Sequence, residues 1–261
     1  MSAGNGTSWP GDSARTNRSA PETAESSDLS TPTSQPSTRP PPAGGRVIAI
    51  GDIHGCADEF EALLVKLAPT PADRIILLGD LINRGPDSRR VITLARAHAH
   101  VSLLGNHELR LLNYRSTGDT AHLKKSDFAT LDQLGETEWA YLKAMPLTYR
   151  CDEHATVMVH GGFVPGRAWD RQPARVVTRV QVVDEHGEPR KRADCPGAPH
   201  WSELWSGPPF VIYGHTPREE PRWSPWALGI DTSCVFGGAL TACILPGRSL
   251  VQVRARKAYY A

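Results

Sequence analysis

The sequence has no run of 18 apolar residues, and no apolar stretch near its start has the length of the hydrophobic region of a secretory signal. We therefore expect neither a membrane-spanning helix nor a signal peptide. The formal net charge of the 261 residues is only +1, so the chain as a whole has no strong attraction to nucleic acids or membrane surfaces. The composition thus argues against a membrane partner and against bulk binding of nucleic acid.

The cysteines are odd in number, widely separated and without a C-x-x-C pair. This spacing is typical neither of a zinc finger nor of a disulfide scaffold. We interpret these residues as small buried thiols in a reducing compartment, and we predict a cytoplasmic protein. The cysteines are Cys56, Cys151, Cys195, Cys234 and Cys243.

Residues 1–45 have very few of the side chains that build a hydrophobic core. Leu29 is the only Val, Ile, Leu or Phe before Val47, whereas Ser, Thr, Pro, Gly and Asn are common. Such a segment cannot bury enough apolar surface to offset the entropy lost on ordering. We predict that residues 1–45 are a disordered tail and that residues 46–261 form the folded domain.

Apolar runs and helical patterns alternate between residues 46 and 104. Short β-branched runs at 46–50, 75–78 and 101–104 predict buried strands. Between them, apolar residues spaced three and four apart predict helices, the second of which has Asp87 or Ser88 as a candidate N-cap. The order strand–helix–strand–helix–strand predicts a βαβαβ unit with a parallel sheet.

The remainder of the chain predicts helices over 107–145 and then a strand-rich, more antiparallel half. Between these strands, the charged segment 184–199 contains many turn formers and predicts a loop or a hairpin. We expect the six histidines outside the motifs described next, His200 among them, to be solvated. The strands are predicted at 156–159, 176–183, 210–213, 228–230, 240–245 and 250–253.

Five short motifs supply carboxylates, imidazoles and one amide, and four of the motifs directly follow an apolar run. Divalent ions such as Mn²⁺, Fe²⁺ and Zn²⁺ accept these ligand types together. In Asp52-x-His54, alternate side chains beyond a strand can reach one ion, and the two oxygens of Asp80 can bridge two ions. Two close cations can activate water and hold a phosphoryl group. The motifs occupy residues 51–55, 79–86, 105–108, 160–162 and 213–216, and the predicted ligands are Asp52, His54, Asp80, Asn106, His160 and His215.

Two further motif residues have side chains suited to catalysis on phosphate. The Arg84 guanidinium can form two parallel hydrogen bonds to phosphate oxygens. His107, beside a predicted metal ligand, can protonate the leaving oxygen as a general acid.

The five motifs in this order closely resemble those of the calcineurin-like metallophosphoesterases, in particular the branch of the phosphoprotein phosphatases and symmetrical diadenosine tetraphosphate hydrolases. The resemblance runs from about residue 45 to the C-terminus. It implies a metallophosphoesterase domain over 46–261, folded as an α/β sandwich of two mixed β-sheets flanked by helices. It implies a first metal on Asp52, His54 and Asp80, a second on Asp80, Asn106, His160 and His215, phosphate binding by Arg84 and Asn106, and proton donation by His107.

Two departures from the family pattern bear on the substrate. Protein phosphatases of this branch have an Asp before the Arg of the second motif, and that carboxylate pairs with the proton-donating histidine, whereas this chain has Asn83. An amide can orient His107 but cannot stabilise an imidazolium, which favours leaving groups that need little protonation, such as nucleoside phosphates. The segment 229–241 is also similar to that of the tetraphosphate hydrolases, whereas Glu108 is the protein-phosphatase form.

Other side chains are candidates for substrate contacts. Arg179, on the predicted strand 176–183, is a candidate for a second phosphate contact. The basic run 190–192 either gathers a polyanionic substrate or is a solvated face of the loop. Four tryptophans near the last motif either stack a nucleobase or pack in the core. They are Trp201, Trp205, Trp223 and Trp226.

Three functions remain open from the sequence. The first is a two-metal phosphatase that cleaves phosphoanhydride or phosphomonoester bonds, with dinucleoside polyphosphates as the favoured substrate. The second is a serine/threonine phosphoprotein phosphatase. The third is a non-catalytic scaffold, which the intact ligand set disfavours. The expected partner is accordingly a phosphorylated small molecule or a phosphoprotein.

Overall fold

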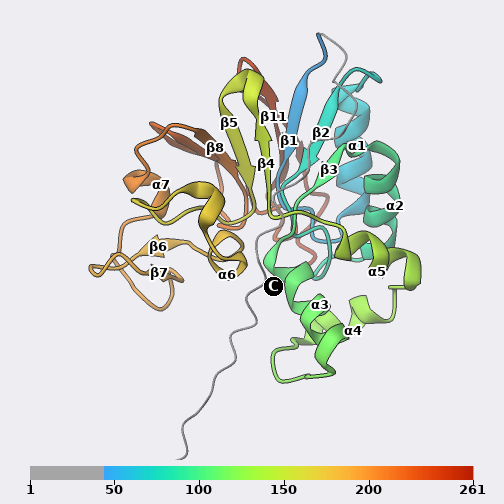
Figure 1. Cartoon of the computed structure of the whole chain (residues 1–261). Helices are drawn as coiled ribbons and strands as arrows, with labels where there is room; N and C mark the ends of the chain where they lie inside the picture. The colour runs from blue at the N-terminus through green and yellow to red at the C-terminus, as the bar shows by residue number, and fades with distance from the viewer. Residues whose placement is uncertain (1–43, 261) are drawn as a thin grey trace, which may run out of the picture.

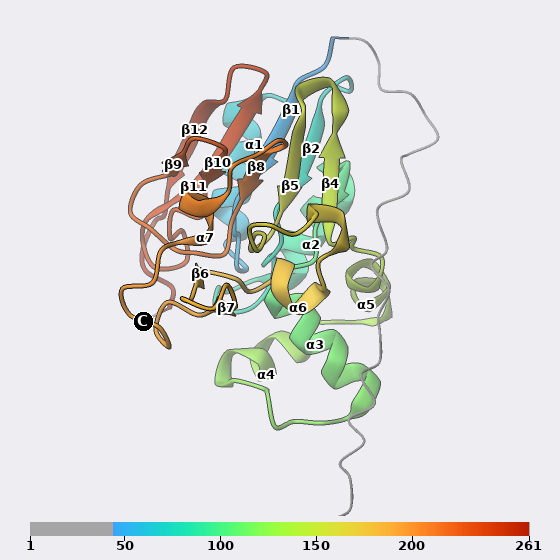
Figure 2. The same cartoon turned by 60° about the vertical axis from the view of Figure 1, so that its left-hand side comes forward.

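Short buried strands at the apolar runs of the sequence build two mixed β-sheets that face each other in the computed structural model (Figure 1). The structure describes residues 44–260, so the predicted tail lies outside the described residues except for residues 44 and 45. Helices flank both sheets (Figures 1 and 2). This architecture confirms the predicted α/β sandwich of two mixed sheets.

The first sheet has the order β12-β11-β1-β2-β3. Its parallel centre is β1 (Val47–Ile50), β2 (Arg74–Leu77) and β3 (Val101–Ser102), which confirms the predicted βαβαβ unit. β11 (Ala239–Leu245) pairs antiparallel with β1, and β12 (Ser249–Arg254) pairs antiparallel with β11. The last two strands of the chain therefore complete the sheet that the first strand begins.

The second sheet has the order β4-β5-β8-β10-β9 and repeats this mixture of directions. β5 (Thr156–Val159), β8 (Phe210–Tyr213) and β10 (Ala227–Gly229) are parallel, close to the predicted positions. β4 (Thr148–Cys151) and β9 (Arg222–Ser224) add antiparallel edges. Neither edge strand was predicted, because each contains an arginine and lacks a continuous apolar run.

The side chains of each central strand alternate between two packing layers, since successive residues of a strand point to opposite faces. Val47 and Ala49 of β1 pack between the sheets in one buried cluster with Ile212 of β8. Ile48 and Ile50 belong to a second cluster, which includes the buried faces of α1 and α2. Complete burial of a Val or Ile side chain contributes about 1.5–3 kcal/mol, so both layers hold the strand ends in place.

Helices α1 (Ala57–Leu67) and α2 (Ser88–His98) lie on the outer side of β1–β3 (Figure 1). Asp87 is the N-cap of α2, because its carboxylate accepts a hydrogen bond from the backbone N–H of Arg90 at 2.8 Å. The predicted helical region 107–145 consists of α3 (Asn106–Thr117), α4 (Lys125–Leu131) and α5 (Glu136–Lys143).

The strand predicted at 176–183 is wrong over most of its length. Its first valines lie in the short helix α6 (Ala174–Val177), which begins after Pro173, and only β6 (Val182–Val183) is extended. The valines of α6 are buried, so a β-branched run that resembles a strand packs as a helical turn. β6 pairs antiparallel with β7 (Pro189–Arg190), which confirms the hairpin alternative for the segment 184–199.

The remaining helical elements of residues 44–260 are a short helix, α7 (Trp201–Leu204), and two single 3-10 turns, Asp152–His154 and Trp169–Arg171. His200 precedes α7 and is 4% exposed, so the expectation that it is solvated is wrong. It is buried because its Nδ1 caps α7, accepting a hydrogen bond from the backbone N–H of Ser202 at 3.2 Å.

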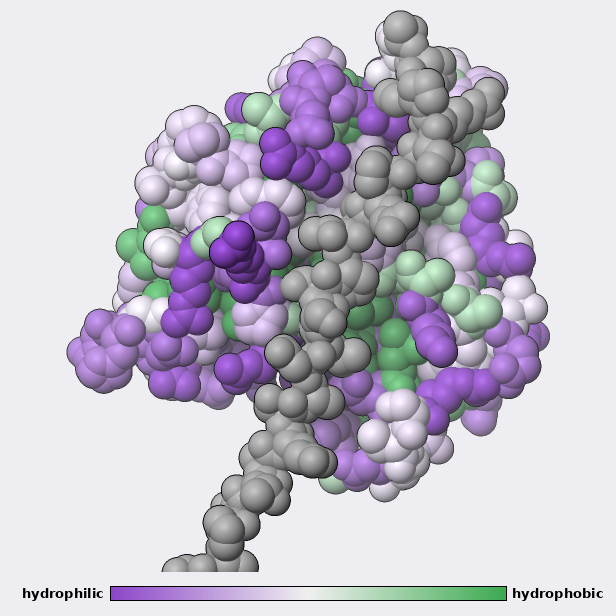
Figure 3. All heavy atoms as spheres, in the orientation of Figure 1, coloured by the Kyte–Doolittle hydropathy of each residue, from purple (hydrophilic) through white to green (hydrophobic). Residues whose placement is uncertain are grey.

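Among residues 44–260 we find no helix with the length and apolarity that a membrane span requires. The face of the molecule seen in Figure 3 carries mainly hydrophilic side chains, with smaller hydrophobic areas between them. The apolar residues of the strands are instead packed in the two buried clusters.

Candidate metal centre

Parallel strands of both sheets end in the same region, above α3 and beside α6 (Figures 1 and 2), and polar residues follow these strand ends. Asp52 follows β1 and Asp80 follows β2. His160 follows β5 and His215 follows β8. Because the carboxyl ends of parallel strands share one edge of a sheet, two facing sheets bring four polar side chains to one place.

The Asp80 carboxylate lies at the centre of this cluster. Its Oδ2 is 3.5 Å from Nε2 of His54 and 3.9 Å from Nε2 of His107. Its Oδ1 is 3.4 Å from Nε2 of His160. Asp80 and His160 also form a compact group with His215. One carboxylate therefore has nitrogen ligands on both sides, as a residue that bridges two metal ions must have.

The two remaining predicted ligands join the same cluster. Oδ1 of Asn106 is 3.1 Å from Nε2 of His160. Oδ2 of Asp52 is 3.9 Å from Nε2 of His54, and its Oδ1 accepts a hydrogen bond from the backbone N–H of His215 at 2.9 Å. The structure thus brings together all six residues that the sequence predicts as metal ligands.

Three imidazoles of the cluster are each oriented by a backbone carbonyl. Nδ1 of His54 is 3.0 Å from the Ile82 carbonyl, and Nδ1 of His160 is 2.8 Å from the Leu78 carbonyl. Nε2 of His215 is 3.1 Å from the carbonyl of Arg179. When a cation displaces its second proton, an imidazole that donates one N–H to a carbonyl binds through the lone pair of its other nitrogen, which is the usual arrangement of a metal-binding histidine. The donor set therefore fits a divalent cation.

The backbone of the cluster adopts a conformation that is rare for residues with side chains. The φ angles of His54, Asp80 and His215 are 48°, 49° and 68°, in the left-handed region. Strain of this kind is found at functional sites, where the surrounding structure compensates for it. The backbone at Gly214 also lies so close to Asp52 that only glycine fits there, because a Cβ on Gly214 would lie only 2.2 Å from Oδ1 of Asp52.

The charges of the cluster are strongly coupled. Burial alone would raise the pKa of Asp80, but the imidazoles of His160, His107 and His54 hold it well below the usual range. Burial would lower the pKa of His160, yet Asp80 and Asp52 raise it to about 10. A concentration of buried acids and bases of this kind is typical of an active site.

Asp231 is a site residue to which the sequence assigned no role. It follows β10, as the predicted ligands follow their strands, and it is 8% exposed. Burial raises its pKa to about 6, although a hydrogen bond from Ser233 opposes this rise. Burial and the nearby Asp231 charge likewise raise the pKa of Asp52. Its position after a buried strand was the signal that could have identified it.

Glu108 fixes the loop that carries Asp80. Its Oε1 accepts the backbone N–H of Leu81 at 2.8 Å, and its Oε2 accepts those of Asp80 and Gly105 at 3.0 Å each. The residue is completely buried, and burial together with the Asp80 charge raises its pKa to about 7. Glu108 therefore joins the loop after β2 to the start of α3.

His107 lies beside Asp80 in a buried network that contains two residues missed by the sequence analysis. Its Nδ1 is 3.0 Å from Nδ2 of Asn83 and 3.0 Å from Nη2 of Arg110. Both donors also bind the buried Asp127: Asn83 Nδ2 is 2.7 Å and Arg110 Nη2 2.8 Å from its Oδ1. With two donors directed at it, Nδ1 of His107 acts as an acceptor, and the proton of the neutral ring lies on Nε2.

Arg84 reaches into the cluster from the loop after β2. Its Nη1 is 2.8 Å from Nε2 of His54. Its guanidinium carbon lies 5.4 Å from the ring centre of Phe236 and 5.6 Å from that of Tyr260. The sequence analysis did not identify these aromatic neighbours, because Tyr260 is 176 positions from Arg84 in the printed sequence.

Arg179 is not on a strand, as predicted, but in the turn after α6, where its N–H donates to the carbonyl of Val176 at 3.0 Å. Its carbonyl orients His215. The pKa of its guanidinium is lowered, first by burial and then by the Arg110 charge, while Asp80 raises it. The side chain thus remains near the cluster, although it projects from a different element than expected.

The four tryptophans do not form a wall beside the cluster. Trp201 and Trp205 are buried in the core. Trp223 and Trp226 are exposed, but Trp226 immediately precedes β10 and lies at the opposite end of the sheet from His215. The core-packing alternative is correct for the first two residues. Sequence proximity to a motif did not reveal which end of a strand each residue occupies.

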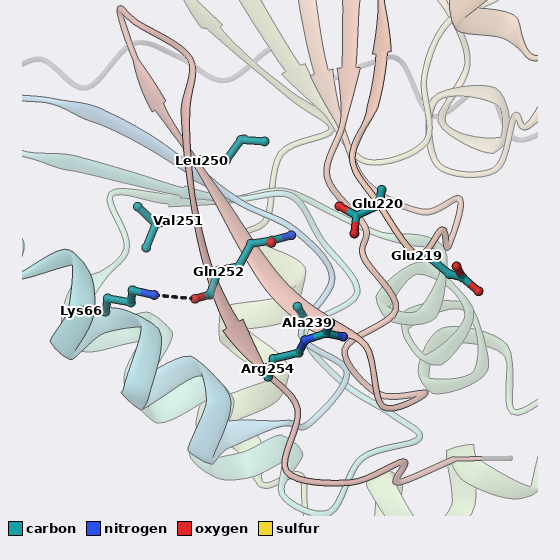
Figure 4. A pocket seen from close by; sticks show the side chains of 8 residues that line it. All are labelled: Lys66, Glu219, Glu220, Ala239, Leu250, Val251, Gln252 and Arg254. Carbon is teal, nitrogen blue, oxygen red and sulfur yellow. Dashed lines mark hydrogen bonds between the residues drawn. The ribbon is translucent and has the colours of Figure 1, made fainter.

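A separate pocket lies beside β11 and β12 (Figure 4). The Lys66 ammonium donates a hydrogen bond to the carbonyl of Gln252 at 3.0 Å along its wall. None of its lining residues is a candidate site residue. They are Lys66, Glu219, Glu220, Ala239, Leu250, Val251, Gln252 and Arg254.

Comparison with known proteins agrees with the geometry of the cluster. A family model described as calcineurin-like phosphoesterase matches residues 45–238. The chain belongs to the calcineurin-like phosphoesterases. This family acts with two divalent metal ions, and the chain is accordingly a metal-dependent phosphoesterase with candidate ligands for such ions.

Two curated relatives cover nearly the same span. A protein of Anoxybacillus flavithermus is 32% identical over 81% of this chain and 95% of its own length. One of Oceanobacillus iheyensis is 29% identical over 83% of this chain and 95% of its own. Both are named bis(5'-nucleosyl)-tetraphosphatase PrpE, with the qualifier asymmetrical. The motifs resemble those of the symmetrical hydrolases, whereas the names of these two relatives describe asymmetrical cleavage.

Solved structures show the same fold. A structure named for a proposed diadenosine tetraphosphatase aligns with a TM-score of 0.73 and 32% identity, over 83% of this chain and 96% of the other. A serine/threonine phosphatase of Saccharomyces cerevisiae aligns with a TM-score of 0.54 and 12% identity, over 81% of this chain and 79% of its own. The second similarity shows the shared fold only.

Proposed function

We propose that this chain is a two-metal hydrolase of dinucleoside polyphosphates. The observation that carries the proposal is the gathering of five other potential ligands around the Asp80 carboxylate, in a chain whose relatives are named for cleaving such compounds. We also infer that diadenosine tetraphosphate is cut into unequal products, as the names of the relatives indicate. Cytoplasmic location is part of the proposal, and the free cysteines Cys56 and Cys234, both buried beside the site, support it.

Six residues would hold the two metal ions. Mn²⁺, Fe²⁺ and Zn²⁺ all suit their mixture of oxygen and nitrogen donors. When bound, the metal pair supplies an activated water and neutralises charge on the phosphoryl group. The first ion would be held by Asp52, His54 and Asp80, and the second by Asp80, Asn106, His160 and His215.

The protein side chains bind the phosphoryl group and direct one proton toward the leaving oxygen. Arg84 holds two phosphate oxygens from the side of His54, and Asn106 contacts the same group. His107 directs Nε2–H toward the leaving oxygen, because Asn83 and Arg110 both donate to its Nδ1. Burial and the nearby cations keep the pKa of His107 well below its usual value, although Asp80 opposes this. A neutral N–H donor of this kind suits a nucleoside phosphate leaving group, which needs little protonation, better than an alkoxide.

Positively charged side chains near the cluster suit a substrate with a chain of phosphates. The pKa of Lys124 is lowered, first by burial and then by the charges of Arg110, Arg84 and Lys191. The backbone N–H of Lys124 and Nε of Arg110 both donate to Oδ2 of Asp127, at 2.7 and 2.8 Å, so these two residues come from separate segments to one carboxylate. Their mutual repulsion is relieved by a polyanion, which supports the polyanion-gathering interpretation of Lys191 and a phosphate contact for Arg179.

Phosphoprotein dephosphorylation is the second candidate function. The buried Glu108, which has the protein-phosphatase form, favours it, since it fixes Asp80 through backbone hydrogen bonds. Against it, the residue beside His107 is Asn83 and the donors to Nδ1 leave no acceptor for an imidazolium. The leaving-group argument therefore places this activity second.

One substrate panel tests both candidates. We would measure kcat/KM on diadenosine tetraphosphate, on a phosphoserine peptide and on an aryl phosphate, each with added Mn²⁺, Zn²⁺ or Mg²⁺. We expect the dinucleotide to be the best substrate and AMP plus ATP to be the products. A strong preference for the phosphopeptide would reverse the order of the two functions, and absence of turnover with every metal would contradict both.

A further inference from the structure

Phe236 and Tyr260 place two aromatic rings directly beside the proposed phosphate-binding arginine. Their ring centres are 6.1 Å apart in an edge-to-face arrangement. The Arg84 guanidinium lies 5.4 Å and 5.6 Å from the two ring centres, and its other contact is His54 at 2.8 Å. Only one side chain therefore separates the aromatic pair from the metal centre.

The fold holds the two rings in place from two distant segments. Phe236 lies in a tight turn, in which its N–H and that of Gly238 both donate to the Ser233 carbonyl, at 3.0 and 2.9 Å. The end of the chain then returns to this turn, and the N–H of Tyr260 donates to the Val235 carbonyl at 3.1 Å. Backbone hydrogen bonds thus fix the pair independently of Arg84.

Phe236 is 38% exposed, although its neighbours Cys234 and Val235 are buried. Tyr260 is half-buried beside it. A phenyl ring that is only partly packed retains an open π-face. Beside a phosphate-binding arginine, such a face is suited to the base of a nucleotide. A base can stack on the ring while its phosphate reaches the guanidinium, because only the sugar separates these two groups.

We propose that Phe236 and Tyr260 form the binding site for the nucleobase whose own phosphate is attacked. This inference rests on the proposed function and specifies how the substrate is oriented. One nucleoside lies on the aromatic pair with its phosphate on Arg84, and the other three phosphates extend away from the rings.

This orientation determines which bond breaks. The oxygen of water forms a bond to the phosphorus nearest the stacked nucleoside, and the bond from that phosphorus to the bridging oxygen breaks. The bridging oxygen leaves on the nucleoside triphosphate, and the two protons of the water are released to that oxygen or to solvent. The products are one nucleoside monophosphate and one nucleoside triphosphate, so the site accounts for unequal cleavage.

The test compares a substrate with bases and one without. We would measure kcat/KM of the metal-loaded enzyme on diadenosine tetraphosphate and on inorganic tetraphosphate, for the wild type, Phe236→Ala and Tyr260→Ala. Loss of a stacking ring costs a nucleobase site about tenfold in affinity. We therefore expect the preference for the dinucleotide to fall by about tenfold in Phe236→Ala, and we expect Phe236→Trp to restore it.

Trp223→Ala is the matched control, because Trp223 is an aromatic residue that is 53% exposed on β9, away from Arg84. It should leave the preference unchanged. An equal loss on both substrates in Phe236→Ala would show that the ring only positions Arg84, and an unchanged preference would show that no base binds there. Either result overturns the proposal.

A binding measurement separates this proposal from the proposed function. Calorimetric titration of the metal-loaded protein with AMP should show weaker binding by about tenfold in Phe236→Ala, without any turnover. Equal affinity of the two proteins for AMP would overturn the nucleobase site even if the wild type cleaves the dinucleotide. Failure of the wild type to cleave either polyphosphate would contradict the proposed function, whatever the binding result.

Discussion

The six candidate metal ligands and the surroundings of His107 are built in different ways. Each of Asp52, Asp80, His160 and His215 lies just beyond a buried strand, so its position follows from the ends of the two sheets. His107 instead depends on Asp127, which approaches from the separate helix α4. The candidate metal ligands are thus positioned by the sheet backbone, whereas His107, the proposed proton donor, is positioned by side chains across a helix interface.

This difference predicts how each region responds to substitution. Strand ends are held by both packing layers, so removal of one ligand should alter the chemistry and leave the fold intact. The network around His107 is buried and charged, and removal of one partner leaves another group unpaired. There, stability and activity should change together.

The largest expected effect is that of Asp80→Asn. Loss of the bridging charge should reduce kcat/KM on an aryl phosphate by about a thousandfold, because a metal pair contributes several kcal/mol to catalysis. Metal content, measured by plasma mass spectrometry, should fall while the unfolding midpoint stays close to that of the metal-free wild type. Asp58→Asn, on the exposed face of α1, is the control. Wild-type activity in Asp80→Asn would contradict the role of Asp80 as a bridging metal ligand.

Glu108→Gln tests the connection between the two regions. Its two carboxylate oxygens accept hydrogen bonds from backbone N–H groups of the Asp80 loop and of Gly105. A glutamine amide has only one acceptor oxygen and can therefore keep only some of these hydrogen bonds. Groups that orient metal ligands typically affect metal affinity by about 10- to 100-fold. We expect a loss of this size in metal titrations, together with a lower unfolding midpoint. An unchanged metal affinity would show that the strand end alone fixes Asp80.

The sequence predicted the first region well because its signals are local. An apolar run followed by a short polar motif marks a strand end, and the structure brings the six candidate ligands of these motifs together. The same reasoning failed at 176–183, where the valines of α6 are as β-branched as those of a strand but follow Pro173. For the tryptophans the sequence left stacking and core packing open, because a position relative to a motif does not indicate which end of a strand a residue occupies.

Asp127 shows why the second region was missed. In sequence it is an ordinary acidic residue in the first turn of a helix, and it does accept the N–H of Lys124 there at 2.7 Å. Its other hydrogen bonds, to Asn83 and Arg110, cross 44 and 17 positions. No local pattern encodes such a partner, so only the structure reveals what compensates for the missing aspartate at position 83.

Asn83→Asp therefore has an outcome that the sequence alone would not predict. A second carboxylate would face Asp127 at a distance where Asn83 Nδ2 now donates at 2.7 Å, and two buried carboxylates this close cannot both ionise. We expect a loss of about 3 kcal/mol in the free energy of unfolding, measured in urea, and about tenfold lower activity on diadenosine tetraphosphate.

The double variant Asn83→Asp, Asp127→Asn exchanges the two groups and serves as the control. It should recover most of the lost stability, because one amide again faces one carboxylate. It also gives His107 a charged partner, so activity on alkyl phosphate esters should increase relative to anhydrides. If the double variant is no more stable than the single one, the two side chains do not interact as described.

The smallest expected effect lies outside both regions, at His200, and it appears only in acid. Burial, followed by the charges of Arg222 and Arg218, lowers the pKa of His200 to about 3, and protonation of Nδ1 would also remove the cap of α7. The unfolded chain binds this proton below about pH 6.5, whereas the folded chain binds it only near pH 3. The stability from this group is therefore fully present above about pH 6.5 and falls as the pH drops from there toward 3.

At pH 5 the wild type should lose about 2 kcal/mol relative to pH 7 from this group, a loss that His200→Gln lacks. Urea unfolding of both proteins at the two pH values measures the difference, and parallel losses would mean that His200 is protonated in the fold. The hydrogen bonds of His200 are made with Ser202 and Glu203, so this loss measures the acid sensitivity of the fold rather than that of catalysis.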